Sequence, residues 1–315
     1  MKKLFLKSKV AVFTLCLFVA ASSCSKNDDD NNTPNTIAKV VSDDPDLSTL
    51  EGAVVKAGIT TILSGPGPLT LFAPTNDGFD NAGISTSDID AMASDDVKKL
   101  LLYHAIPSKI LAADVPAGPN AKVITANGDS VFVTNNSKGV FINGVQVVQA
   151  DISATNGVVH KIDNVLVPAS GNIVETAQAD TALTFLVAAV VHASTGSVDV
   201  AGVLSGSDIL TVFAPTNNAF RAAGFTSIDQ INAANPDVLA GILVYHVLNG
   251  RIFSSDLTDG QVAATLKPGS SVTIGVSSSG VTVKGTTNTS ASNVIKANIV
   301  ATNGVVHVID QVLLP

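Results

Sequence analysis

The chain has 315 residues, a formal net charge of -8 and no tryptophan, and its length is sufficient for about two domains. An acidic surface repels phosphate backbones and gains nothing from counterion release, so the composition excludes nucleic acid as a partner. The two cysteines, Cys16 and Cys24, lie close to the N-terminus, which leaves the remaining chain without the material for a disulfide framework.

The first 23 residues have the pattern of a secretory signal peptide. A lysine-rich head precedes an apolar run from 10 to 21, which is too short to cross a bilayer of about 30 Å. Small residues then lead into Cys24, and this stretch resembles the lipobox of bacterial lipoproteins, although Ala21 stands where leucine is usual. The resemblance implies cleavage before Cys24 and lipidation of that cysteine. The alternative is an ordinary cleaved signal followed by an unmodified cysteine.

Residues 24–36 are predicted to form an acidic and polar tether. Removal of residues 1–23 would take away four lysines and no acidic residue, which changes the net charge from -8 to -12. The aspartates at 28–30 lack the turn glycine and the rigid ring of oxygens that a calcium loop needs. The acidic run resembles the export signal of some surface lipoproteins, which implies a lipid-anchored protein on the outer membrane, exposed at the cell surface.

Three sequence motifs occur twice in the same order, so the remainder of the chain is a tandem duplication. The last motif, ATNGVVHKIDNVLVP at 154–168, returns at 301–315 with twelve of fifteen positions identical. The others are TLFAPTNDGF, repeated as TVFAPTNNAF, and LLLYHAI, repeated as ILVYHVL. The repeats predict a first domain at 37–168, a linker at 169–172 and a second domain at 173–315.

The first half of each domain has helical periodicity around one short strand. In the first domain, apolar residues at helical spacing follow Asp44-Pro45, and the strand LTLFA precedes a short helix that Thr75 or Asn76 caps. Ser94 is predicted to cap a longer helix whose apolar face includes His104. The second domain repeats each of these features.

The second half of each domain has a period of two, which predicts strands and hairpins. Asn156-Gly157 and Asn303-Gly304 are the strongest turn signals, and they predict type I′ turns with positive φ. Helices followed by an antiparallel sheet define an α+β fold.

Four of the five histidines occupy repeated positions: His104, His160, His246 and His307. As catalysts they would need a nucleophile or carboxylate partner, and as metal ligands a convergent third donor. The sequence has no G-x-S-x-G, H-E-x-x-H or phosphate-binding loop motif. The favoured interpretation is structural, with each ring bonded inside an apolar face, and no metal or cofactor is expected.

The three motifs in this order, each present twice, resemble the fasciclin-like (FAS1) domain over about residues 37–315. The resemblance implies a β-sheet wedge with packed N-terminal helices and places the first and last motifs on central strands. It implies extracellular adhesion, with modules that bind proteins or glycans at cell surfaces, and it does not imply an enzyme.

The resemblance also implies candidate binding residues. In some animal matrix members an Asp-Ile pair before the last motif takes part in integrin binding, and here Asp151 and Ile152 occupy those positions. Asn298 replaces the acid in the second copy. The Tyr-His segment has also been linked to receptor binding, and here it is Tyr103-His104 and Tyr245-His246. The alternative is that Ile152 and Ile299 are strand core and Asp151 is a solvated strand residue.

The sequence therefore predicts a surface-anchored, non-catalytic module that binds a surface or matrix protein. The alternative is an envelope protein that binds polysaccharide, although the absence of tryptophan argues against stacking-based sugar sites. Contact with the membrane is expected through the lipid anchor.

Overall fold

The computed structural model describes residues 34–315. The predicted signal peptide, Cys24 and most of the tether lie outside the described residues. No helix in the described part of the chain is long and apolar enough to cross a membrane. We call residues 37–168 domain 1 and residues 173–315 domain 2; α1 begins at Ile37 and α7 at Ile173.

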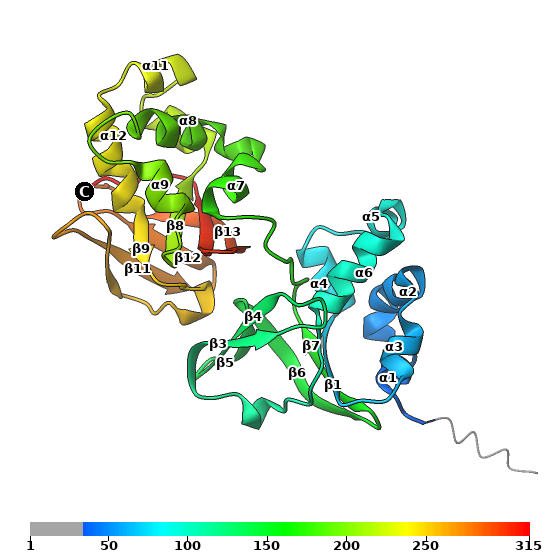
Figure 1. Ribbon diagram of the computed structural model, residues 1–315. Coiled ribbons are helices and arrows are strands. Elements are labelled where there is room, and N and C mark those ends of the chain that lie inside the picture. Colours follow the sequence, from blue (N-terminus) through cyan, green and yellow to red (C-terminus); the bar gives the residue numbers. More distant parts are fainter. Residues whose placement is uncertain (1–33) are drawn as a thin grey trace, which may run out of the picture. The chain divides into compact units, whose positions relative to one another are not determined.

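Each domain places a group of helices against one seven-stranded sheet (Figure 1). The helices of domain 1 are α1 (Ile37–Asp43), α2 (Ser48–Ala57), α3 (Thr60–Ser64), α4 (Asn76–Asn81), α5 (Thr86–Ala91) and α6 (Ser94–Tyr103). Its strands are β1 (Leu69–Pro74), β2 (Ala105–Ile106), β3 (Gly118–Ile124), β4 (Ser130–Asn136), β5 (Gly139–Ile142), β6 (Val145–Ala154) and β7 (Gly157–Ile162).

Domain 2 repeats this order of elements. Its helices are α7 (Ile173–Gln178), α8 (Thr184–Ala193), α9 (Val200–Ser205), α10 (Asn217–Ala222), α11 (Ile228–Asn232) and α12 (Pro236–Leu243). Its strands are β8 (Leu210–Pro215), β9 (Val247–Asn249), β10 (Val262–Ala264), β11 (Ser271–Ser277), β12 (Gly280–Lys284), β13 (Ser292–Ala301) and β14 (Gly304–Ile309).

The α+β architecture is confirmed, but the expectation of a wholly antiparallel sheet is wrong. The strand order is β2-β1-β7-β6-β5-β4-β3 in domain 1, and domain 2 has the same order of counterparts. The first and last long strands are neighbours and run parallel, as β1 with β7 and β8 with β14. All other pairs are antiparallel, so each sheet is mixed. The parallel pairing is possible because a long connection, from α4 to β6, separates β1 from β7 and lets the chain re-enter the sheet at the same end.

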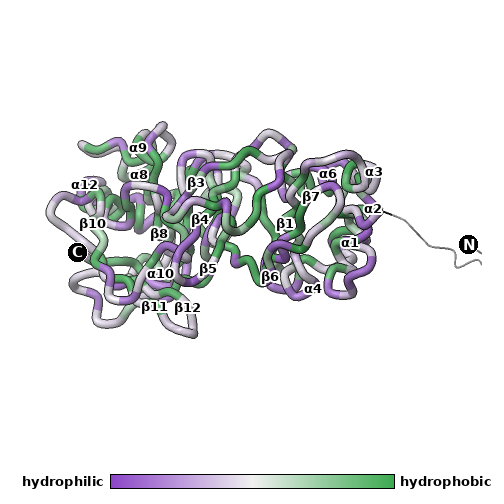
Figure 2. Tube along the Cα trace, turned by 90° about the horizontal axis from the view of Figure 1, so that it is seen from below, coloured by the Kyte–Doolittle hydropathy of each residue, from purple (hydrophilic) through white to green (hydrophobic). Residues whose placement is uncertain are grey.

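Both faces of each sheet carry an apolar core. In domain 1 one face packs against the helices through Leu71 and Val159, and the other encloses Phe72 and Ile162 under β3 to β6. Coloured by hydropathy, apolar stretches run through the strands of both sheets (Figure 2). The central strands β7 and β14 are buried along their whole length, which accounts for the near-continuous apolar sequence of the last motif.

The predicted caps are confirmed for the short helix and wrong for the longer one. Thr75 caps α4, with its hydroxyl accepting the Gly78 N–H at 3.0 Å. Ser94 is instead the first residue of α6, and Ala93 occupies the cap position without a side-chain hydrogen bond.

Candidate functional site

The turn motif holds the N-terminal helices to the sheet. In both domains the asparagine side chain accepts the first N–H of the first helix and donates to two carbonyls at the end of the third. In domain 1, Asn156 accepts from Ile37 N at 2.9 Å and donates to Leu63 O and Gly65 O at 2.9 and 2.8 Å. Asn303 makes the three corresponding bonds in domain 2.

The type I′ prediction at these turns is wrong, because neither residue of either pair has a positive φ. The turn in domain 1 consists of Thr155 and Asn156, and Gly157 already belongs to β7. A Cβ on Gly157 would lie 1.9 Å from the Leu69 carbonyl oxygen, and one on Gly304 would lie 2.0 Å from the oxygen of Leu210. These glycines therefore permit the close approach of the two parallel strands.

Asp151 lies on a bulge in β6 and ties the sheet to the loop that precedes β3. Its φ is +61°, a left-handed conformation that Asp and Asn tolerate better than most residues. Its carboxylate accepts the Ala112 N–H at 2.9 Å, and its own N–H donates to Nδ1 of His160 at 3.2 Å. His160 Nε2 donates to the Ile110 carbonyl at 2.8 Å, so one histidine joins strand and loop.

The second domain reproduces this local geometry without the charge. Asn298 has a φ of +63°, accepts the Ser254 N–H at 2.8 Å and donates its N–H to His307 Nδ1 at 3.3 Å. His307 Nε2 lies 2.9 Å from the Ile252 carbonyl. The local structure therefore requires an Asp or Asn here, and the negative charge of Asp151 is not needed to hold the loop.

The two positions differ in exposure. The Asp151 side chain is 43% exposed, and Val148 on the same strand is 53% exposed. Ile152 points inward and packs against the helical core. Asn298 is covered by domain 1, because its Nδ2 donates to the Gly144 carbonyl at 3.3 Å.

Domain 2 uses the loop beside Asn298 to contact domain 1. The Phe132 ring of β4 lies between Phe253, at 6.3 Å between ring centroids, and the Arg251 guanidinium, at 4.1 Å. Burial lowers the pKa of Arg251 to about 10. Asp256 accepts the Thr134 hydroxyl at 3.0 Å. Aromatic, cationic and hydrogen-bonding contacts thus converge on one strand of domain 1.

Three further side chains, on β3, on β4 and in the turn between β4 and β5, extend this interface. Asn120 donates to the Arg251 carbonyl at 2.7 Å, Asn136 donates to the Ser255 carbonyl at 3.1 Å, and Lys138 Nζ donates to the Leu257 carbonyl at 2.6 Å. Domain 2 supplies main-chain carbonyls to all three.

The corresponding loop of domain 1 remains open to solvent. Lys109, Leu111 and Asp114 occupy the positions of Arg251, Phe253 and Asp256, as the shared loop hydrogen bonds show. Lys109 and Asp114 are exposed and Leu111 is half-buried. We call the surface formed by Lys109, Leu111, Asp114, Val148 and Asp151 the Asp151 face.

The Tyr-His segments lie inside the domains. Tyr103 is 1% exposed and donates its hydroxyl to the Ser130 carbonyl at 3.1 Å, and Tyr245 donates to the Ser271 carbonyl at 2.7 Å. His104 is fully buried. A role of these side chains in binding stays a prediction, and it would have to act through the surface segments that they support.

The helix-end histidines are neutral and fully hydrogen-bonded. His104 Nδ1 donates to the Leu100 carbonyl at 2.8 Å and Nε2 accepts the Leu166 N–H at 2.9 Å. His246 has the same pair of partners, Ile242 and Leu313. Burial lowers the pKa of both histidines to about 4. A ring whose two nitrogens are both held by main chain has no nitrogen free for proton transfer, which supports the structural interpretation.

Within residues 34–315, no three His, Cys, Asp or Glu side chains gather in a metal-binding arrangement. Of the predicted binding residues, the structure brings only Asp151 to the surface and leaves Ile152 and the two Tyr-His pairs inward. The contacts of Phe132 and Arg251 were missed by the sequence analysis, because neither residue belongs to a repeated motif.

Comparison with known proteins agrees with this architecture of two tandem α+β modules. The family profile described as Fasciclin domain matches residues 45–168 and 183–315. The chain belongs to the fasciclin-domain family.

The relatives include bacterial and animal proteins. Protein sll1483 of Synechocystis is 36% identical over 137 residues, covering 42% of this chain and 73% of that protein. Human periostin is 32% identical over 260 residues, covering 80% of this chain, and pig transforming growth factor-beta-induced protein ig-h3 is 31% identical over 233 residues, covering 74%. The chain spans only 29% and 32% of these two animal proteins. A solved FAS1 domain pair from the insect cell adhesion molecule fasciclin I has a TM-score of 0.41 at 19% identity, covering 86% of this chain and 97% of the other.

Proposed function

We propose that the chain is a non-catalytic adhesion module, anchored at the cell surface through its N-terminal segment, which binds a protein partner through the Asp151 face. Membership of the fasciclin-domain family and the tandem arrangement support an extracellular interaction module. The anchor is the one expected from Cys24 in the sequence.

One observation carries the choice of this face. Its counterpart on domain 2 is the surface that contacts a protein module, because Arg251, Phe253 and Asp256 pack against β4 of domain 1. Lys109, Leu111 and Asp114 offer a cation, an apolar side chain and a carboxylate at the same positions, and domain 2 does not cover them. Asp151 adds a second carboxylate where domain 2 has the neutral Asn298.

The chemistry of the Asp151 face favours a partner with a cationic or cation-binding surface next to an apolar contact. Leu111, which is half-buried, and Val148, which is exposed, provide apolar area for contact. The carboxylates of Asp114 and Asp151 make binding depend on the charge and orientation of the partner. The face has no aromatic side chain on which a sugar ring could stack, and its counterpart in domain 2 contacts protein, so protein is the favoured class of partner.

The experiment measures binding of residues 34–315 to intact producer cells, to a panel of matrix and surface proteins, and to extracted envelope polysaccharide. Asp151→Asn removes the charge and keeps the oxygen that accepts the Ala112 N–H, as Asn298 does in domain 2. Asp80→Asn makes the same change of charge on the exposed surface of α4 and serves as the matched control.

Saturable binding to a protein that weakens at least about fivefold in Asp151→Asn, and not in Asp80→Asn, supports the proposal. Equal affinities of the two variants would exclude the Asp151 face. Binding to polysaccharide alone would replace the protein partner with the glycan alternative. Absence of binding by the folded protein would leave a spacer role in the envelope.

A further inference from the structure

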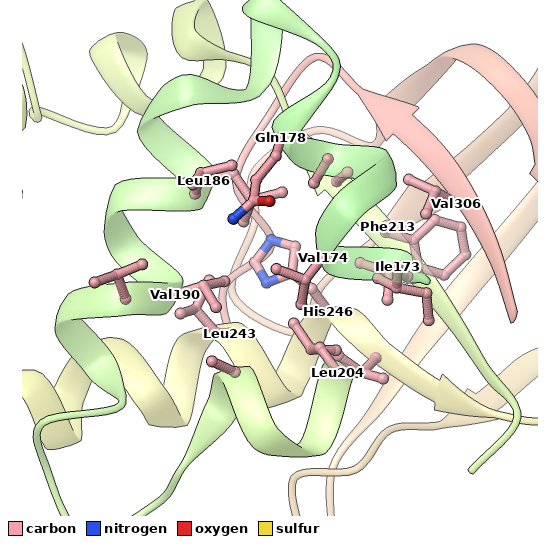
Figure 3. Close-up of a pocket in the computed structure, with 17 residues that line it drawn as sticks. Ile173, Val174, Gln178, Leu186, Val190, Leu204, Phe213, Leu243, His246 and Val306 are labelled. Atoms are coloured by element: carbon pink, nitrogen blue, oxygen red, sulfur yellow. The ribbon is translucent and has the colours of Figure 1, made fainter. Parts of the chain in front are cut away.

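Domain 2 contains an apolar cavity of about 160 Å³ between its helices and its sheet. Helices α7, α8, α9 and α12 contribute Ile173, Leu186, Val190, Leu204 and Leu243 to its lining, and β8 and β14 close it from the sheet side (Figure 3).

The lining is uncharged and holds one free polar group. Only Gln178 and His246 carry polar side-chain atoms there, and both ring nitrogens of His246 are already bonded to main chain. Gln178, at the end of α7, directs its amide over the cavity toward His246 (Figure 3). The site therefore disfavours ions, because a charge placed there would lose its hydration without gaining a partner.

Domain 1 fills the corresponding region with different side chains. At two of the lining positions it carries larger ones, Val41 in place of Ala177 and Leu71 in place of Val212, and at two others smaller ones, Ala38 in place of Val174 and Ala105 in place of Val247. An empty apolar cavity destabilises a protein in proportion to its volume. A ligand that fills the cavity would offset this cost in domain 2.

The rim of the cavity has also changed in character. Val187, half-buried on α8, occupies the position of Glu51 in domain 1, and Gln178 occupies that of Ser42. Val191, which also lines the cavity, is 59% exposed, and its counterpart Val55 in domain 1 is exposed as well. An apolar rim around an apolar cavity removes the desolvation cost for a hydrophobic molecule that enters.

We propose that domain 2 binds a small uncharged aromatic molecule in this cavity, with a single hydroxyl or carbonyl group hydrogen-bonded to the Gln178 amide. Apolar cavities of about 150 Å³ bind benzene, so the volume fits one substituted ring. This site is separate from the Asp151 face and does not depend on the function proposed for it.

The test titrates residues 34–315 with toluene, p-cresol and benzoate as probes. Binding is detected from amide chemical shifts in nuclear magnetic resonance spectra. Toluene and p-cresol are expected to shift amides of α7, α8, α12 and β8, with p-cresol the tighter ligand. Benzoate, which is charged at neutral pH, is expected to leave them unchanged.

Variants that introduce the residues of domain 1 provide the decisive comparison. Ala177→Val with Val212→Leu fills the cavity and is expected to raise the Kd for p-cresol at least about tenfold without lowering the melting temperature. Val133→Ile is the matched control. It exchanges a residue that lines a different pocket, in domain 1, for isoleucine, the residue at the corresponding position 274 of domain 2, and it is expected to leave these shifts unchanged.

Val187→Glu covers the case in which the filled variant does not fold, because it alters only the rim. It is expected to weaken p-cresol binding several-fold. The proposal would be overturned if the shifted amides lay outside domain 2 or if benzoate bound as tightly as p-cresol. It would also be overturned if binding did not saturate at millimolar probe, or if both the filled and the rim variants kept the affinity of the unchanged protein.

Discussion

Acid is expected to destabilise each domain through its buried helix-end histidine. His104 and His246 are 0% and 2% exposed, and burial lowers the pKa of each to about 4. In the unfolded chain a histidine has a pKa of about 6.5. Between these values the unfolded chain binds more protons than the folded protein, so the free energy of unfolding is highest above pH ~6.5 and falls as the pH decreases.

The size of the effect follows from the two pKa values. Linkage gives a loss of about 2 kcal/mol per domain at pH ~5 and about 3 kcal/mol at pH ~4. These losses are a large part of the stability of a typical domain. Burial raises the pKa of Asp163, so protonation of that carboxyl at low pH favours the folded state. It therefore reduces the loss of stability that the histidines cause.

The assay is urea denaturation of residues 34–315 at pH values between about 7 and about 4.5, followed by circular dichroism. The double variant His104→Gln/His246→Gln is expected to be less stable at neutral pH, because glutamine fits the two main-chain partners poorly, but to lose the part of the pH dependence that these two histidines contribute. Each single variant should remove the contribution of its own histidine, and domain 2 keeps that of His307, whose pKa burial also lowers. An unchanged slope in the double variant would refute the reasoning.

Three further substitutions test the packing of domain 1, each by urea denaturation. Asn156→Ala leaves three buried main-chain groups without partners and is expected to cost about 2–4 kcal/mol; a loss below ~0.5 kcal/mol would contradict this role. Gly157→Ala forces apart the parallel strands at Leu69 and is expected to cost about 3 kcal/mol or more, whereas a normally stable variant would show that the strands can separate freely. Lys161 Nζ lies 2.6 Å from Asp44 and 3.1 Å from Asp46, so Lys161→Met is expected to cost about 1 kcal/mol at low salt and less at high salt; a cost independent of salt would indicate lost packing instead.

Local patterns in the sequence were sufficient for the helices and for the duplication. Leu47, Leu50 and Val54 are spaced for one helical face, and all three are buried. The hairpin of β4 and β5 follows from alternation and from Gly139, whose φ is positive. These features depend on neighbours within a few residues, which the sequence presents directly.

The errors arose where contacts are distant in the chain. Asn156-Gly157 has a strong local turn preference, but the position is determined by Ile37, Leu63 and Leu69, which come from other elements. The parallel pairing of β1 with β7 has the same origin. Local propensity could not reveal these constraints because they exist only after the helices pack on the sheet.

The candidate site was predicted in part for a related reason. The resemblance to fasciclin-like domains pointed to Asp151, and the structure exposes that carboxylate. The resemblance did not indicate whether Tyr103 is buried or exposed, because an aromatic residue at the end of an amphipathic helix is compatible with either. The structure buries it. The contrast with Asn298, covered by Gly144, required both domains in place.

The most direct test of the proposed function is a hydrogen-exchange footprint of residues 34–315 with and without the protein that they bind. The account predicts slower amide exchange at residues 109–115 and 148–152, with the helices of both domains unchanged. Protection confined to domain 2, or to the helices of domain 1, would contradict the assignment of the binding surface to the Asp151 face.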